Sequence, residues 1–245
     1  MKYINKKLTI ERVSVQAIAN KYNTPTYCYS FNKLKENIIN FKNSFKSFSP
    51  LVCFAIKSNT NSNLIREIKN FGLGADVVSK GELMTAIKAG INPKKIVFSG
   101  VGKTTDEISY AIDKKILLIN AESKSEVFEI NRVAKLKKKK VFIGIRINPN
   151  TDAKTLSQIS TGKKENKFGI TERDFYKLVN YVKNSKYINL KCLSVHIGSQ
   201  ILDYRPYEKM LKVLDKILNI IDHKFEFIDL GGGMGSSYDD KTKKL

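Results

Sequence analysis

The sequence predicts an α/β protein built on a (β/α)8 TIM-barrel, with about seven of the eight strands present. Short apolar runs alternate with stretches of helical periodicity over most of the chain, which is typical of a parallel sheet covered by helices. Seven such runs occur in 245 residues, and a complete barrel closes with eight in about 250. Polar residues follow nearly every run, as at the carboxyl end of a barrel, whereas an open doubly wound sheet would concentrate them at one switch point.

The chain is expected to have two parts. Residues 1–30 form an N-terminal segment, in which 14–22 have helical periodicity and 26–30 read as a short β-rich strand. Residues 31–48 carry apolar side chains at helical spacing. From there to the end, residues 31–245 are expected to form the incomplete barrel.

Seven strands and six helices alternate in the predicted barrel. The expected strands are 51–56, 75–79, 95–99, 116–120, 141–147, 192–196 and 226–230. The expected helices are 63–71, 81–89, 105–113, 125–137, 171–184 and 205–221. Thr171, followed three residues later by Asp174, is typical of a helix start.

The composition bears on whether the protein binds nucleic acid, whether it spans a membrane and whether its cysteines are buried. The net charge of +21 raises nucleic-acid binding as an alternative. The lysines are spread along the chain, however, and neither zinc-finger spacing nor an aromatic RNA-binding motif is present, which favours a solvated lysine-rich surface and no nucleic acid. No apolar run approaches the roughly 18 residues of a membrane span, and the charged N-terminus has no signal core, so we expect a cytoplasmic protein. Cys28, Cys53 and Cys192 lie in apolar runs and are expected to be buried thiols.

The first candidate for chemistry is Lys57, which follows the apolar run 51–56 directly. A lysine at the end of a buried strand is expected to be partly desolvated, which frees its amine to attack a carbonyl. A snorkelling lysine is the structural alternative. The residues further along the chain decide between the two.

Two later predicted strands are followed by residues that could take part in a binding site. These are a glycine run and a serine suited to binding phosphate, and the ring of a histidine. Gly231, Gly232 and Gly233 follow the last predicted strand, and adjacent glycines let backbone N–H groups converge on an anion. His196 ends the preceding strand, and Ser199 could donate its hydroxyl to phosphate. With only two histidines and no ligand spacing, a metal site is not expected.

Arg146 and Asp76 are charged residues inside predicted strands, so each needs a partner or a function. A structural ion pair is the alternative interpretation for either. Taken together, an amine, a ring, a carboxylate and a phosphate cradle match what pyridoxal 5'-phosphate requires, a Schiff-base lysine and an anion site.

With these residues in view, the sequence resembles diaminopimelate decarboxylase, a family of fold-type III pyridoxal-phosphate enzymes that also include ornithine decarboxylase and alanine racemase. The resemblance extends over nearly the whole chain. Its motifs are 54–59, 75–83, 98–104, 152–155, 159–162, 165–170, 196–200 and 231–235, and the stretch 148–170 indicates the diaminopimelate branch.

The resemblance implies an alanine racemase-like barrel and a role for each candidate. Lys57 would bind the cofactor covalently, Asp76 would orient that linkage, and His196 would stack on the ring. Ser199 and Gly231 to Gly233 would hold the phosphate, and Arg146 would support the acidic residue at the pyridine nitrogen. The implied reaction is decarboxylation of meso-2,6-diaminopimelate to L-lysine and CO2, the last step of lysine biosynthesis, in a homodimer.

The chain departs from the family pattern in several places. None of its five prolines belongs to the acidic-Pro-Gly-Arg motif of the last barrel strand, and Lys80 stands where glycine is common. The family's C-terminal β domain, which holds substrate-binding residues and would pair with residues 26–30, is missing. We therefore expect a C-terminally truncated chain that is unstable or inactive alone. Two alternatives stay open, a non-catalytic single-domain pyridoxal-phosphate carrier and a basic nucleic-acid-binding α/β protein.

Overall fold

The computed structural model describes residues 1–152, 161 and 168–236. The chain divides into two compact units, Met1–Val52 and Cys53–Leu245. The predicted division lay at residue 30, so the structure groups the helix that follows with the N-terminal segment. Whether either unit folds independently stays a prediction.

The N-terminal unit contains a small sheet that the sequence did not reveal. β1 (Lys2–Ile4), β2 (Lys7–Ile10) and β3 (Val13–Ser14) pair as consecutive antiparallel strands. The first turn, Asn5-Lys6, has positive φ at both residues, which matches the twist of a two-residue hairpin. Neither turn of this sheet contains the glycine that usually signals one, so the hairpins were missed.

Two helices complete this unit. The strand predicted at 26–30 is not formed in this structure, and its expected pairing with a C-terminal β domain stays a prediction. α1 (Val15–Tyr22) begins at Ser14 and α2 (Phe31–Ser44) at Ser30, each capped by the serine side chain. Residues 26–30 form no strand, because they pair with no other strand in the described part of the chain. Cys28 is accordingly exposed rather than buried.

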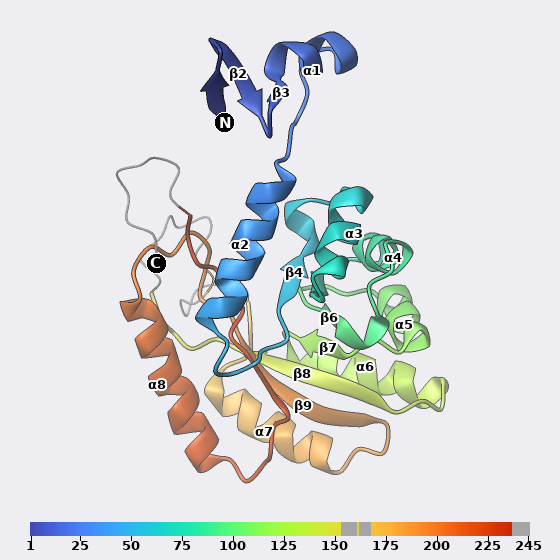
Figure 1. Ribbon diagram of the computed structural model, residues 1–245. Helices are drawn as coiled ribbons and strands as arrows, with labels where there is room; N and C mark the ends of the chain where they lie inside the picture. The colour runs from blue at the N-terminus through green and yellow to red at the C-terminus, as the bar shows by residue number, and fades with distance from the viewer. Residues whose placement is uncertain (153–160, 162–167, 237–245) are drawn as a thin grey trace. The chain divides into compact units, whose positions relative to one another are not determined.

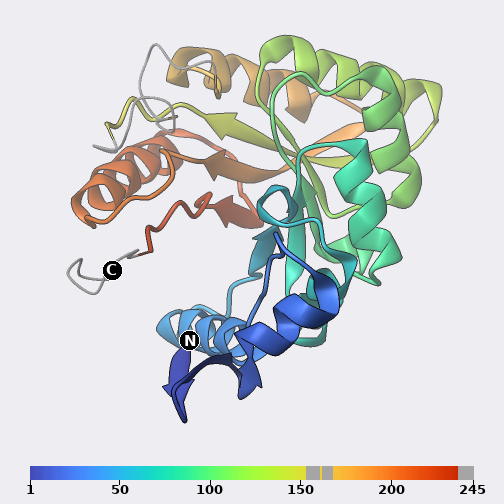
Figure 2. The same ribbon diagram turned by 90° about the horizontal axis from the view of Figure 1, so that it is seen from above.

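The second unit confirms the predicted barrel sheet. Seven parallel strands lie in the order β10-β9-β8-β7-β6-β5-β4, so neighbours in the sheet are neighbours in sequence. The strands are β4 (Cys53–Ala55), β5 (Gly74–Val77), β6 (Ile96–Phe98), β7 (Leu118–Ala121), β8 (Val141–Ile147), β9 (Ile188–Val195) and β10 (Phe227–Asp229). Figures 1 and 2 show the sheet curling through part of a barrel.

Six helices connect these strands, at the predicted positions to within a residue or two. They are α3 (Ser62–Asn70), α4 (Lys80–Lys88), α5 (Thr105–Lys114), α6 (Lys124–Leu136), α7 (Glu172–Lys183) and α8 (Arg205–Ile220). Serine or threonine side chains cap α4, α5, α6 and α7, and Thr104 forms a capping box with Glu107. Among the described residues, no helix is long and apolar enough to cross a membrane.

The core of this unit lies between the sheet and its helices. Isoleucine, valine, leucine and alanine fill it, together with the fully buried rings of Phe98 and Phe175. Cys192 is buried as predicted, in a separate small cluster with Val97 and Leu118, and Cys53 packs half-buried against it, where burial raises the pKa of its thiol to about 12. This packing fixes the strands, so the residues at their carboxyl ends are held in place for the site.

Candidate functional site

Lys57 lies beyond the end of β4, in a single 3-10 turn over Ile56–Ser58. The Ser58 hydroxyl donates to the Ala55 carbonyl at 2.7 Å, and the Asn59 N–H donates to the Ile56 carbonyl at 3.0 Å, which fixes the turn. Ile56 is fully buried and Lys57 is exposed. The expectation of a partly desolvated lysine is therefore wrong in this structure, because the strand ends at Ala55 and Lys57 is exposed in the turn that follows. An exposed amine is open to a ligand.

Asp76, in β5, is the nearest acidic candidate. Burial raises the pKa of its carboxyl to about 6, against the opposing effects of a hydrogen bond with Ser99 and the charge of Lys57, while the Asp229 charge raises it further. Its Oδ1 is buried without a hydrogen-bond partner among the described residues. The carboxyl thus senses the Lys57 ammonium and keeps one oxygen available for a donor.

His196 follows β9 and has a neutral ring. Burial lowers its pKa to about 4, and the charges of Arg146 and Lys57 lower it in the same direction. Its Nδ1 is buried and makes no hydrogen bond to the described residues. A neutral imidazole near Lys57 can lie against an aromatic ligand without adding charge to the site.

The three glycines after β10 lie against the end of β9. Gly231, Gly232 and Gly233 have φ of +69°, +71° and +86°. A Cβ on Gly231 would lie 2.3 Å from the Val195 carbonyl oxygen, and one on Gly233 would lie 2.0 Å from that of Gly198. A Cβ added to Gly232 would have no described neighbouring atom within 4 Å. Glycine is therefore required for the close approach, and the middle of the run faces open space where an anion would fit.

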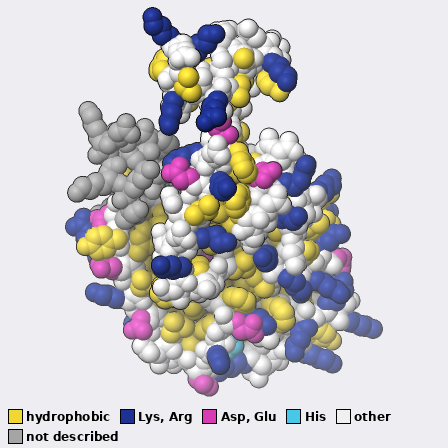
Figure 3. Space-filling model, viewed as in Figure 1, with side chains coloured by type: hydrophobic (Ala, Val, Ile, Leu, Met, Phe, Trp, Pro, Cys, Tyr) yellow, Lys and Arg dark blue, Asp and Glu magenta, His cyan; other side chains and the backbone are white. Residues whose placement is uncertain are grey.

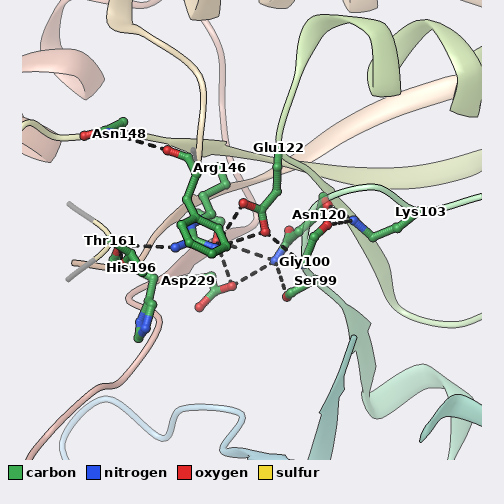
Figure 4. Close-up of polar contacts among 12 residues, drawn as sticks. Ser99, Gly100, Lys103, Asn120, Glu122, Arg146, Asn148, Thr161, His196 and Asp229 are labelled. Carbon is green, nitrogen blue, oxygen red and sulfur yellow. Dashed lines mark hydrogen bonds and ion pairs between the residues drawn. The ribbon is translucent and has the colours of Figure 1, made fainter. Parts of the chain in front are cut away.

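Arg146 takes part in a buried ion pair that the sequence did not reveal. Its Nη1 donates to Glu122 Oε1 at 3.0 Å and Oε2 at 3.1 Å, and its Nη2 donates to the His196 carbonyl at 3.3 Å. Its guanidinium lies 4.9 Å from the centre of the Phe168 ring. The Thr161 hydroxyl donates to the same His196 carbonyl at 2.8 Å (Figure 4). Glu122 directly follows β7, so the rule that drew attention to other strand ends could have found it.

A second buried pair lies beside the first. Lys103 Nζ donates to Glu126 Oε1 at 2.6 Å and to the carbonyls of Gly100 and Asn120 at 2.7 Å each. Glu126 Oε2 accepts from the Glu122 N–H at 2.9 Å. The two pairs form a buried cluster of two positive and two negative residues, which we call the charge cluster: Lys103, Glu126, Glu122 and Arg146.

Polar side chains also meet on the inner face of the sheet. Asn120 Nδ2 donates to Asp229 Oδ2 at 2.9 Å and to Ser99 Oγ at 3.3 Å, and the Ser194 hydroxyl donates to Asp229 Oδ2 at 2.9 Å. These residues come from or follow β6, β7, β9 and β10. Ser99 also forms a hydrogen bond with the Asp76 carboxyl. Asp76 is therefore linked to Asn120, Ser194 and Asp229 by a continuous network of hydrogen bonds.

The structure thus brings together most of the predicted site. The pKa values of Asp76 and His196 both respond to Lys57, that of His196 also to Arg146, and Gly231 lies against the His196 side chain. Ser199 is exposed in the loop after β9, and a contact between its hydroxyl and a phosphate stays a prediction. An accessible amine, a neutral ring, a buried carboxylate oxygen and a glycine cradle fit pyridoxal 5'-phosphate.

Known proteins resemble this chain closely. Residues 31–245 match the family described as "Pyridoxal-dependent decarboxylase, pyridoxal binding domain". The diaminopimelate decarboxylase of Helicobacter pylori strain J99 is 44% identical over 230 residues, which are 91% of this chain and 56% of the relative. That of Aquifex aeolicus is 38% identical over an alignment 247 residues long, which covers 100% of this chain and 58% of the relative.

Solved structures agree with the sequence comparisons. The H. pylori diaminopimelate decarboxylase complexed with L-lysine has a TM-score of 0.88 at 39% identity, covering 94% of this chain and 59% of that one. The M. jannaschii diaminopimelate decarboxylase in co-complex with L-lysine has a TM-score of 0.92 at 33% identity, with coverage of 99% and 58%. The chain therefore spans a little over half the length of these relatives.

Proposed function

The chain belongs to the pyridoxal-dependent decarboxylase family, and we propose that it forms the cofactor-binding barrel of a diaminopimelate decarboxylase. The reaction would convert meso-2,6-diaminopimelate to L-lysine and CO2. One observation carries this proposal: Lys57, Asp76, His196 and the glycine run converge at the carboxyl ends of parallel strands. The identity of 37–44% to curated diaminopimelate decarboxylases supports the choice of substrate.

Each residue has a role that follows from its surroundings. The exposed Lys57 amine would bind the cofactor covalently, and Asp76, whose pKa of about 6 leaves it largely ionised at pH 7, would keep that nitrogen in position. The uncharged His196 ring would stack on the cofactor. The phosphate would meet the backbone at Gly232 and Gly233, since the Gly231 N–H already donates to Asp229 Oδ1 at 2.9 Å. Bound pyridoxal phosphate would supply the electron sink for loss of the carboxylate.

Assembly and location remain predictions. A homodimer and a cytoplasmic location are what the family resemblance and the sequence lead us to expect. Nucleic-acid binding is the weaker alternative, because Lys and Arg side chains occur on many parts of the visible surface, interleaved with uncharged ones (Figure 3). A nucleic-acid interface would need a clustered basic face and a steep loss of affinity with salt.

The experiment is covalent trapping of the cofactor. The chain is mixed with pyridoxal phosphate, reduced with borohydride, digested and mapped by mass spectrometry. We expect one modified peptide containing Lys57, and none in Lys57→Ala. Lys80→Ala is the matched control, since Lys80 forms a surface ion pair with Asp106 at 2.7 Å and should leave the adduct intact. An adduct spread over surface lysines would contradict the proposal.

Substrate choice is tested on the loaded protein. Release of lysine from meso-2,6-diaminopimelate, with no product from ornithine or arginine, is the expected result. A specific adduct at Lys57 without turnover of any amino acid would favour the pyridoxal-phosphate carrier instead.

A further inference from the structure

Within the charge cluster, Glu122 contacts both the loop after β6 and Arg146 in β8. Glu122 is 3% exposed and Arg146 is 7% exposed, so both charges are removed from water. Glu122 Oε1 accepts from the Gly100 N–H at 2.8 Å as well as from Arg146. Its backbone N–H is held by Glu126. Three hydrogen bonds therefore hold this carboxylate between the loop after β6 and the end of β8, and a fourth holds the backbone of the same residue.

Arg146 in turn donates a hydrogen bond to the backbone of His196. Both carboxylate oxygens of Glu122 accept from Arg146 Nη1, which leaves Nη2 free to donate to the His196 carbonyl. The Thr161 hydroxyl supplies a second donor to that carbonyl. In Figure 4 the His196 ring lies apart from the Arg146–Glu122 pair, while its backbone faces them. The pair therefore acts on the backbone of His196 and leaves the ring free for a ligand.

We propose that Glu122 is a positioning residue, which holds Arg146 so that the guanidinium fixes the His196 backbone and thereby the ring that would stack on bound pyridoxal phosphate. This inference rests on the proposed function for the identity of the ligand. The position of the ring is a property of the chain itself, so it can be tested with and without the cofactor.

The test without cofactor follows the His196 ring by proton NMR. The chain has only two histidines, so His223→Gln assigns both signals. In the wild type, His196 should titrate with a pKa of about 4. In Glu122→Gln and Glu122→Asp, the ring should be released toward water and its pKa should rise toward the ordinary 6.5. Loss of the Glu122 charge alone, with nothing moving, would lower that pKa, so the two explanations differ in sign.

The matched control is Glu126→Gln. It breaks the neighbouring buried pair with Lys103 but leaves the contacts from Glu122 to Arg146 and from Arg146 to His196. We expect it to lose stability without moving the His196 titration. An equal shift in Glu126→Gln, or no upward shift in either Glu122 variant, would overturn the proposal. If both Glu122 variants fail to fold while Glu126→Gln folds, the role is structural and the proposal also fails.

The test with cofactor measures affinity for pyridoxal phosphate by absorbance. We expect Glu122→Gln to weaken binding about tenfold while the borohydride adduct still forms at Lys57, and Glu126→Gln to bind like the wild type. Unchanged affinity in Glu122→Gln would count against a positioning role. If the wild type binds no pyridoxal phosphate, the proposed function fails, whereas the His196 titration still decides whether Glu122 positions the ring.

Discussion

The ionisation of Asp76 should make the stability of the protein depend on pH. Its pKa is 3.8 in ordinary surroundings and about 6 in the folded chain, chiefly because it is buried. The folded state therefore holds the proton more tightly than the unfolded state. The contribution of Asp76 to stability is therefore greatest below pH 4, falls as pH rises from about 4 to about 6, and then levels off.

The size of the effect follows from the two pKa values. Their difference of about 2 corresponds to about 3 kcal/mol, since each pKa unit is worth about 1.4 kcal/mol. Asp76→Asn cannot ionise, so its free energy of unfolding should lack this dependence. Relative to the wild type, the variant should gain up to about 3 kcal/mol between pH 4 and pH 7, whatever constant cost the amide brings.

The assay is urea unfolding followed by circular dichroism at a series of pH values from about 2 to about 8, which spans the range in which each carboxyl titrates. Asp113→Asn is the control with the opposite sign, because hydrogen bonds from Lys137 and Lys139 lower the pKa of Asp113. The stability that Asp113 contributes is present above its ordinary pKa and is lost as pH falls. If the difference between wild type and Asp76→Asn stays constant from pH 4 to pH 7, the assigned burial of the Asp76 carboxyl is refuted.

Three further substitutions test the packing around the site. Gly233→Ala places a Cβ 2.0 Å from the Gly198 carbonyl oxygen and should lower stability by at least about 1 kcal/mol; a thermal melt matching the wild type would contradict the close approach. Lys103→Met leaves Glu126 without its cation and should cost about 3–5 kcal/mol in urea unfolding, most of which Lys103→Met with Glu126→Gln should recover. Thr104→Ala removes the capping box of α5 and should cost about 1 kcal/mol, with a loss below about 0.3 kcal/mol arguing against the cap.

The barrel strands could be predicted because they are short, apolar and bounded by polar residues. The run 141–147 matches β8 at both ends, since Lys140 and Asn148 bracket it. At β4 the strand ends one residue before the predicted end, and Lys57, which was expected to be partly desolvated at the strand end, is exposed in the turn that follows. Hydrophobic pattern locates a strand well but places its last residue poorly.

The partners of the site residues could not be predicted in the same way. Arg146 stood out as a buried charge that needs an acceptor, but Glu122 lies 24 residues earlier in the chain, just after the neighbouring strand β7. Asn120 and Asp229 are 109 residues apart and meet only because the sheet curls. Pairing of this kind depends on strand order and curvature, which a single sequence does not contain. The hairpins of residues 2–14 were missed for a different reason, the absence of glycine in their turns.

The strand order has a consequence for how the chain acquires its structure. Each strand of the described seven-stranded sheet after β4 pairs with the strand made just before it, so these pairings need no segment from further along the chain. A nascent chain leaving the ribosome can therefore add one strand and one helix at a time to a sheet that already exists. Each addition closes a loop of a few tens of residues, whose entropic cost rises only slowly with length. Synthesis from the N-terminus would thus add the glycine run after β9, onto a strand end that is already in place to receive it.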